Sequence, residues 1–493
     1  MSKKFRVRFA PSPTGFLHIG GLRSALYDEL FARHHGGDFI LRIEDTDQAR
    51  TVEGGVENIC NSLKDAGVIP NEGMWIDDNG KIIERGKHGP YIQSKRQKKH
   101  LAYAEKLIKM DKAYYCFCTE ERLKDLRAQQ TKNEQAPGYD GKCCDLDHKE
   151  AEQRVRKGEK HVIRLKFPQK GKITFEDIIR GKVEFDWSVI DDQVIIKTSG
   201  MPTYHLASTC DDHDMEISHV LRGEEWLPST PKHLFIYEAF GWKPPKFAHL
   251  PLLLNEDRSK LSKRQGDVSV SEILEKGYLP QALLNFVALL GWNPTADREI
   301  YTHDELVELF NLEKVNKAGA VVNYEKFDWL NSHYIKELTD SEYLEKARLF
   351  IKTKIRDQEF IDRALLLARD RLVRINDVAD EIDYLLKEKF NYKEVSLPWK
   401  KQSKKEVIQR LEALLDLVNE FSDKQALDIP KVEKEIKKLI ADKEWGNGDT
   451  LWPLRVALSG SEKSPGPFEL IATYGKERAI ARIKDSLTHL KGT

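Results

Sequence analysis

The stretch FRVRFAPSPTGFLHIGGLRSALYDELFARHHGGDFILRIEDTD, residues 5–47, decides the fold of this 493-residue chain. Its first five residues alternate and run into a proline-containing turn, as in a strand leaving its sheet. Leucines then recur at helical spacing over 22–34, and Gly36 and Gly37 end the helix. A second strand is predicted over 39–43. Strand, glycine turn, helix and strand form a βαβ unit, so we expect a parallel sheet with a nucleotide site at its first turn.

Length and composition indicate a multidomain protein with buried cores. The chain is 40% hydrophobic and 32% charged, and its 80 basic residues balance 80 acidic ones. Its length predicts two to four domains. Zero net charge does not indicate a basic domain that coats nucleic acid, but it is compatible with an enzyme that must release an RNA product. No apolar run reaches the roughly 18 residues of a membrane span, and no signal peptide is evident, so we expect a cytoplasmic protein without membrane contact.

The pattern changes along the rest of the chain. Residues 97–135 are helical and charged, with an interruption at 114–118, and strand-like runs follow in 161–197, which indicates an inserted subdomain. Strand and helix patterns resume between 204 and 240. After Gly291 the pattern is mostly helical to the end.

Two segments have the chemistry to bind a triphosphate. His18-Ile19-Gly20-Gly21 stands at a helix start, where glycines admit phosphate, the helix N-terminus favours its charge and a histidine can stabilise charge developing at phosphorus. The segment DRSKLSKRQG, residues 257–266, offers lysines and an arginine in a short loop, as in a mobile phosphate clamp. Either segment alone is compatible with an ordinary surface turn, but their joint occurrence in this order favours a nucleotide site.

With these segments, the sequence resembles the class I aminoacyl-tRNA synthetases of the glutamyl/glutaminyl branch. The matching stretches are 10–15 with HIGG, 42–47 (RIEDTD), KLSKR, 202–207 (PTYHLA), 211–214 (DDHD) and 221–226 (LRGEEW). Residues 455–460 (RVALSG) with 464–466 (SPG) resemble the end of the bacterial glutamyl enzymes. The similarity covers nearly the whole chain.

The resemblance implies an α/β fold, with a Rossmann-like parallel-sheet catalytic domain, an inserted acceptor-stem subdomain and an α-helical anticodon-binding region. The expected segments are a first catalytic half (1–100), an acceptor-binding insertion (101–197), a second catalytic half (198–255), a stem-contact domain with the KLSKR loop (256–330) and helical anticodon-binding domains (331–493).

The resemblance also implies roles for site residues. His18 and Lys263 are expected to be catalytic. The expected ATP-binding residues are Pro11, Gly20, Gly21, Lys260, Ser262, Lys263, Arg264 and Trp226. The expected glutamate-binding residues are Arg8, Ala10, Ser12, Glu44, Tyr204 and Arg222. Arginines suit the two carboxylates of glutamate, and Glu44 suits its ammonium. Ser208 stands where some members have Asn, which affects pocket hydrogen bonding but not the reaction class.

The implied reaction begins with attack of the glutamate α-carboxylate on the α-phosphorus of ATP, with Mg²⁺ bound to the departing diphosphate. The terminal hydroxyl of tRNA then attacks the glutamyl-adenylate. In this branch the first step generally needs tRNA. The partners implied are L-glutamate, ATP and tRNA(Glu), with the protein a monomer.

Four of the six cysteines fall between Cys116 and Cys144, which in a cytosolic chain favours a metal over disulfides. Some family members have a Cys-x-Cys…Cys-x-His zinc site here, which implies structural Zn²⁺ on Cys116, Cys118, Cys143 and Asp145. Cys144 or His148 are alternatives for the fourth ligand. Free, partly buried thiols without metal are the competing reading.

Arg371 aligns roughly with an arginine that restricts some members to tRNA(Glu). The sequence leaves open whether tRNA(Gln) is also charged and whether a partner such as an amidotransferase docks. The 399–405 lysine run is more typical of a solvated loop than of an RNA patch. A glutaminyl enzyme should have a β-barrel C-terminal half, and a truncated tRNA-modifying paralogue should end near residue 310. The length after KLSKR also argues against a small-molecule nucleotidyltransferase. A catalytically dead RNA-binding protein should have lost His18, Gly20 or Lys263.

Overall fold

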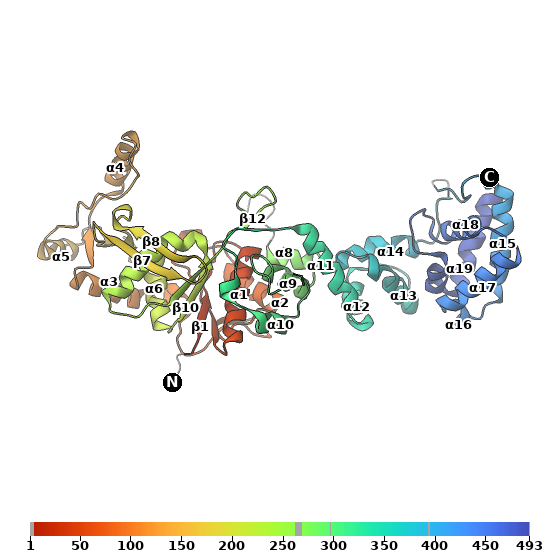
Figure 1. The fold of residues 1–493 in the computed structure, drawn as a ribbon, viewed down its shortest axis with the longest axis horizontal. Helices are drawn as coiled ribbons and strands as arrows, with labels where there is room; N and C mark the ends of the chain where they lie inside the picture. Colours follow the sequence, from red (N-terminus) through yellow and green to blue (C-terminus); the bar gives the residue numbers. More distant parts are fainter. Residues whose placement is uncertain (1–3, 262–268, 296, 393–394, 493) are drawn as a thin grey trace. The chain divides into compact units, whose positions relative to one another are not determined.

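The protein is described here from a computed structural model that covers residues 4–261, 269–295, 297–392 and 395–492. The chain forms two compact units (Figure 1). The first consists of residues 1–275 and 280–327, and the second of residues 276–279 and 328–493. The boundaries predicted within each unit remain predictions.

The first unit begins with the predicted βαβ element. Strands β1 (Arg6–Phe9), β2 (Asp38–Leu41) and β3 (Glu72–Ile76) run parallel, and β4 (Ile82–Arg85) pairs antiparallel at the edge. In the register of β1 and β2, Arg8 lies opposite Ile40. The strands predicted at 5–9 and 39–43 are therefore confirmed to within two residues.

A second sheet completes the parallel centre. Its order is β10 (His219–Gly223), β11 (Lys246–Leu250), β7 (Lys172–Asp177) and β8 (Gly181–Asp186). The backbone N–H of Ser218 donates to the carbonyl of Arg6 at 2.9 Å, which joins β10 to β1. Strands β7 and β8 thus pair with the catalytic sheet, although the strand pattern grouped them with the insertion.

Helices cover both faces of these sheets. The helices in this part of the chain are α1 (Ile19–His34), α2 (Gly55–Ala66), α6 (Tyr204–Asp214), α7 (Thr230–Ala239), α8 (Val270–Glu275), α9 (Pro280–Ala288) and α10 (His303–Leu309). The leucines that predicted α1, Leu22, Leu26 and Leu30, are fully buried. Two short parallel strands, β12 (Leu253–Leu254) and β13 (Ala320–Val321), pair beside them.

The insertion has its own antiparallel sheet of β5 (Ala113–Cys116), β6 (Val162–Leu165) and β9 (Val194–Ile196). Its helices are α3 (Gln97–Lys109), α4 (Glu120–Lys132) and α5 (His148–Arg156). Phe167, Trp187 and Phe235 pack their rings in the core beneath this sheet. Helix α4 projects from the body and buries none of its residues (Figure 1).

In the second unit, the described residues form helices and no strand. These are α11 (Tyr324–Glu337), whose first turn belongs to the first unit, α12 (Asp340–Ala347), α13 (Gln358–Ala368), α14 (Val378–Leu386), α15 (Lys404–Glu420), α16 (Asp423–Ala426), α17 (Ile429–Asp442), α18 (Asn447–Ser459) and α19 (Pro467–Gly492). Gly475, with φ 72°, kinks α19. Capping boxes at Thr339–Glu342 and Ser403–Glu406 fix two helix starts. The predicted helical C-terminal region is confirmed, and a β-barrel there is excluded for the described residues.

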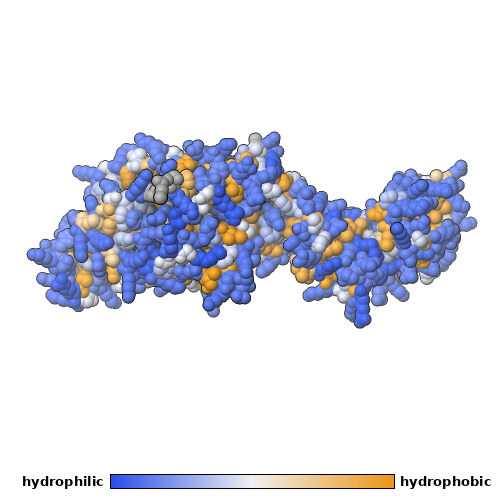
Figure 2. All heavy atoms as spheres, turned by 90° about the horizontal axis from the view of Figure 1, so that it is seen from below, coloured by the Kyte–Doolittle hydropathy of each residue, from blue (hydrophilic) through white to orange (hydrophobic). Residues whose placement is uncertain are grey.

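The visible surface is mostly hydrophilic, with apolar residues in small scattered groups (Figure 2). Among the described helices, none combines the length and apolar character needed to cross a bilayer.

Candidate active site

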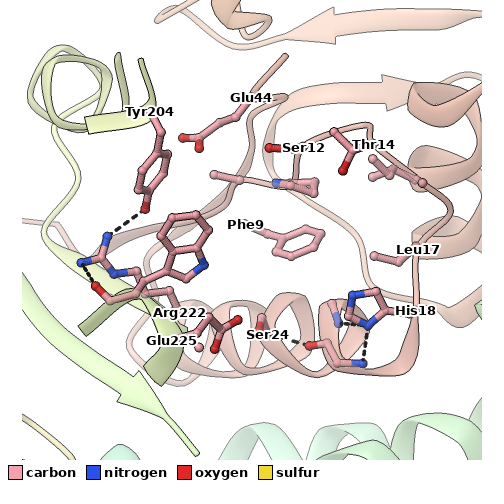
Figure 3. Close-up of a pocket in the computed structure, with 18 of the residues that line it drawn as sticks. Phe9, Ser12, Thr14, Leu17, His18, Ser24, Glu44, Tyr204, Arg222 and Glu225 are labelled. Carbon is pink, nitrogen blue, oxygen red and sulfur yellow. Dashed lines mark hydrogen bonds between the residues drawn. The ribbon is translucent and has the colours of Figure 1, made fainter. Parts of the chain in front are cut away.

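A cavity of about 640 Å³ lies beside the ends of β1 and β10. It is lined by residues from the loop after β1, the start of α1, the segment after β2, the start of α6 and the chain after β10 and β11. This is where a parallel α/β sheet binds ligands, because the loops leaving its strands converge there. Figure 3 shows Tyr204, Glu44 and Arg222 toward one end of the cavity and His18 at the other.

Most of the predicted site residues lie in the lining of this one cavity. They are Arg8, Ala10, Pro11, Ser12, His18, Gly20, Gly21, Glu44, Tyr204, Arg222, Trp226 and Lys260. Ser262, Lys263 and Arg264 lie outside the described residues. Lys260 lines the cavity and precedes Ser262 by two residues in the sequence.

His18 caps helix α1. Its Nδ1 atom accepts hydrogen bonds from the backbone N–H groups of Gly20 at 3.1 Å and Gly21 at 3.3 Å. A Cβ atom at Gly20 would lie 3.1 Å from the His18 ring, and one at Gly21 would lie 2.8 Å from Leu17. The predicted glycine turn is thus the first turn of the helix, which begins at Ile19 and not at Leu22. Because Nδ1 accepts, a neutral His18 carries its proton on Nε2.

Two of the buried arginines in the site are neutralised by carboxylates. Arg8 forms a two-pronged pair with Asp212, with nitrogen–oxygen distances of 2.9 and 3.3 Å. Arg42 donates to Glu44 at 2.9 Å and lies 2.8 Å from Asp212. Burial raises the pKa of Glu44 even though Arg42 and Arg8 oppose that shift. Ser208, predicted to affect pocket hydrogen bonding, accepts from Arg42 at 3.3 Å.

The third arginine, Arg222, is buried among neutral groups. Its Nε donates to His249 at 3.1 Å, Nη1 to Tyr204 at 2.8 Å, and Nη2 to Thr230 at 2.8 Å. Further contacts reach the Trp226 carbonyl at 3.3 Å and a ring nitrogen of His233 at 3.4 Å. No carboxylate of the described residues forms an ion pair with Arg222. An unneutralised buried guanidinium is costly unless a ligand supplies the anion, so this site is suited to a carboxylate.

Tyr204 and Trp226 form an aromatic wall beside Arg222, with ring centroids 4.5 Å apart. Trp226 remains 40% exposed, so its face is available to a stacking ligand. Burial raises the pKa of Tyr204, which keeps its hydroxyl protonated beside Arg222.

Residues not predicted from the sequence complete the surroundings of Arg222. His249 is fully buried on β11, and its Nδ1 lies 2.6 Å from an Asp177 oxygen. The Nε2 atom of His233, on α7, lies 3.3 Å from Nδ1 of His205. A histidine among the apolar residues of the strand KFAHL was a usable signal, but Asp177 is 72 residues away in sequence and carried none.

The cysteine cluster lies in the insertion. The sulfur atoms of Cys116, Cys118 and Cys143 all lie within 4.8 Å of one another. Asp145, Cys144 and His148, the candidates for a fourth ligand, are not part of this cluster in the described residues. Instead, the Tyr139 hydroxyl lies 3.3 Å from the Cys116 sulfur and 3.5 Å from that of Cys118.

The donor set of this cluster fits zinc. A hydrogen bond from Cys143 lowers the pKa of the Cys116 thiol to about 4, against the opposing effect of burial. The same hydrogen bond raises the pKa of Cys143. Zinc prefers sulfur ligands, and the three cysteine sulfur atoms lie close enough together to bind one ion. The sequence missed Tyr139, four residues before Cys143, because phenol oxygen is an uncommon ligand.

Arg371 ends a short 3₁₀ turn (Arg369–Arg371) in the second unit, where it is exposed. Its role at the anticodon stays a prediction.

Comparison with known proteins extends over both units. The family model described as "tRNA synthetases class I (E and Q), catalytic domain" matches residues 4–329, and "Anticodon binding domain" matches residues 335–487. The glutamate–tRNA ligase of Clostridioides difficile is 41% identical over 97% of this chain and 98% of its own length. That of Chloroherpeton thalassium is 42% identical over 98% of each.

Solved structures agree. The crystal structure of a glutamate–tRNA ligase from Elizabethkingia meningosepticum, in complex with its amino acid, matches 99% of this chain and 100% of its own, with a TM-score of 0.88 and 36% identity. A second structure, from Elizabethkingia anophelis, gives a TM-score of 0.86 at 36% identity, covering 98% of this chain and all of its own. The chain belongs to the glutamate–tRNA ligase family of class I aminoacyl-tRNA synthetases.

Proposed function

We propose that the chain joins L-glutamate to the 3′ end of tRNA(Glu) through a glutamyl-adenylate, converting ATP to AMP and diphosphate. The observation that carries this proposal is the buried, unneutralised Arg222 in the same cavity as the helix N-terminus capped by His18. The first feature suits a carboxylate, and the second suits a phosphate. The names of the relatives support the same reaction.

In the first step, an α-carboxylate oxygen of glutamate forms a bond to the α-phosphorus of ATP, and the bond from that phosphorus to the bridging oxygen breaks to release diphosphate. His18 and the N-terminus of α1 stabilise the added negative charge. By its resemblance to the family's KLSKR lysine, Lys263 would supply a further cation to this charge. Mg²⁺, bound with ATP, would neutralise the departing diphosphate. The terminal tRNA hydroxyl then attacks the carbonyl carbon, and AMP leaves.

The amino-acid end of the cavity selects for charge. Arg222 receives a substrate carboxylate against the Tyr204 hydroxyl, and Glu44 receives the ammonium. Arg8 and Ser12 also line the cavity. Glutamine would leave the Arg222 charge without an anion, which is expensive in a buried site.

Zinc would be held by Cys116, Cys118 and Cys143, with the fourth position taken by Tyr139 or by Asp145 after local rearrangement. It would act as a structural ion that ties the insertion together. Metal analysis of the purified protein tests this. Absence of zinc from undialysed protein would contradict it.

The second unit would read the anticodon loop, with Arg371 favouring tRNA(Glu) over tRNA(Gln). The protein would act as a monomer in the cytoplasm. All of these points rest on the resemblance, and the match of residues 335–487 to anticodon-binding domains supports the first of them.

Aminoacylation with labelled glutamate or glutamine against separate tRNA(Glu) and tRNA(Gln) tests the proposal. Charging of glutamate onto tRNA(Glu) alone is expected. Charging of glutamine with a kcat/KM comparable to that for glutamate would contradict the assigned pocket, and equal rates with both tRNAs would remove the role of Arg371. Lys263→Ala is expected to slow ATP–diphosphate exchange, measured with tRNA present, by about tenfold or more. Unchanged exchange would remove Lys263 from the mechanism.

A further inference from the structure

Arg222 is held on its inner side by a buried chain of polar groups. The pairing of β10 with β11 places Arg222 directly opposite His249. The Nε atom of Arg222 lies 3.1 Å from His249 Nε2, and His249 Nδ1 lies 2.6 Å from Asp177 on the next strand, β7. His249 is fully buried and Asp177 is 3% exposed, so water does not compete with these bonds.

The protonation of this chain follows from its donors. A guanidinium Nε can only donate, so His249 Nε2 must accept. The neutral His249 ring therefore carries its proton on Nδ1 and donates it to Asp177. The other Asp177 oxygen accepts backbone N–H bonds from Ile179 at 3.0 Å and Arg180 at 2.8 Å. The carboxylate is thus fixed in place and fixes the tautomer.

We propose that His249 and Asp177 are positioning residues that aim Arg222 at the substrate carboxylate and leave its positive charge unneutralised, and so contribute to selection of glutamate over glutamine. The inference rests on the proposed function. It identifies two residues, neither in the cavity lining, through which the amino-acid site acts.

The arrangement has a physical reason. If a carboxylate lay directly against Arg222, as Asp212 lies against Arg8, the guanidinium would already be paired and would gain less from a substrate anion. A neutral imidazole satisfies Nε as an acceptor without cancelling the charge. The negative charge of Asp177 is held one ring farther away, on the opposite side of His249.

Asp177→Asn tests the tautomer. Its amide oxygen can keep the backbone bonds to Ile179 and Arg180, while its NH₂ group faces His249 Nδ1. That nitrogen must then accept, and the His249 proton moves to Nε2, where it opposes the Nε–H of Arg222. We expect the KM for glutamate to rise about tenfold or more, with the KM for ATP changed less than about twofold.

His249→Gln and His249→Leu separate position from packing. The Gln oxygen can take the place of Nε2 as acceptor, so we expect a glutamate KM within about threefold of wild type. Leu offers no acceptor, so we expect a rise like that of Asp177→Asn and a smaller ratio of glutamate to glutamine in kcat/KM. His219→Gln, on β10 but outside the cavity lining, is the matched control and should leave both KM values unchanged.

The double variant Asp177→Asn/His249→Gln gives the decisive comparison. Gln has no tautomer to reverse, so its glutamate KM should stay close to that of His249→Gln alone, and the two effects should not add. Additive effects, or an unchanged KM in both Asp177→Asn and His249→Leu, would overturn the inference. If His249→Leu fails to fold, the other variants still decide.

A substrate-free measurement separates this inference from the proposed function. Nitrogen NMR of histidine-labelled protein, with His249→Gln used for assignment, should show Nδ1 protonated in wild type and Nε2 protonated in Asp177→Asn. A protonated Nε2 in wild type would refute the proposed tautomer of His249 even if the enzyme attaches glutamate to tRNA. Conversely, absence of glutamate charging would refute the proposed function and leave the tautomer result standing.

Discussion

Replacement of Arg222 by Gln isolates the charge on which glutamate recognition depends. Arg222 contacts Tyr204, Thr230, His249, His233 and a backbone carbonyl, all of them neutral. None of the described residues gives Arg222 an anionic partner, so the substrate carboxylate would be the first. A charge-assisted hydrogen bond of this kind contributes about 1.5–3 kcal/mol, so loss of it should lower kcat/KM for glutamate by about 10- to 150-fold.

The assay is aminoacylation of tRNA(Glu) at varied glutamate, with glutamine as competing substrate. Arg222→Gln should lose activity with glutamate much more than with glutamine. The reason is that the neutral amide introduced at position 222 does not favour a substrate anion over a neutral substrate. Arg6→Gln is the matched control: Arg6 is also buried, but it pairs with Asp38 and Glu72 outside the cavity lining. It should lower thermal stability and leave the glutamate KM unchanged.

A fall of less than about threefold in Arg222→Gln would mean that the substrate carboxylate is bound elsewhere. An equal loss with glutamate and glutamine would mean that Arg222 supports the fold of the site and does not read charge. Either result would refute the reasoning from its neutral surroundings.

Three further predictions concern the cap, pH and metal. His18→Ala should lower the rate of ATP–diphosphate exchange by about 10²-fold or more and the free energy of unfolding by about 1 kcal/mol. His18→Asn keeps an acceptor for the helix cap, so it should recover the stability but not the exchange rate. Recovery of the exchange rate would contradict a role of His18 at the phosphate. Burial lowers the pKa of His249 below its usual 6.5, and Arg222 and Arg180 lower it further, while Asp177 opposes the shift. The ring is therefore neutral at pH 7. Protonation of the ring at acidic pH should raise the glutamate KM. His249→Gln should show a flatter profile below pH 6.5, and an unchanged acidic limb would assign it to another group. Cys116→Ser should lower zinc content and destabilise the insertion, and full zinc retention in that variant would exclude the cluster.

The sequence was sufficient for the first catalytic elements because local signals agreed there. Alternation in β1, leucine spacing in α1 and the glycines that follow all favour the same βαβ unit. The predicted start of α1 at Leu22 is wrong, because Gly20 and Gly21 are typical of a turn but belong to the first turn of the helix. The cap formed by His18 depends on side-chain geometry that no residue spacing reveals.

The inner side of the amino-acid site depends on strand pairing. His249 meets Arg222 only through the register of β10 and β11, and Asp177 reaches His249 only because β7 joins the same sheet. Strand neighbours separated by tens of residues leave no periodic signal in a single sequence. The contact of the Tyr139 hydroxyl with the Cys116 sulfur depends on a loop conformation, which residue spacing does not reveal either.

The most direct test is a crystal structure with a non-hydrolysable glutamyl-adenylate analogue. The side-chain carboxylate should lie about 3 Å from Arg222, and the group in place of the α-phosphate should contact both His18 and Lys263. An analogue bound in this cavity with its carboxylate away from Arg222, or with Lys263 out of reach of the phosphate position, would contradict the assignment.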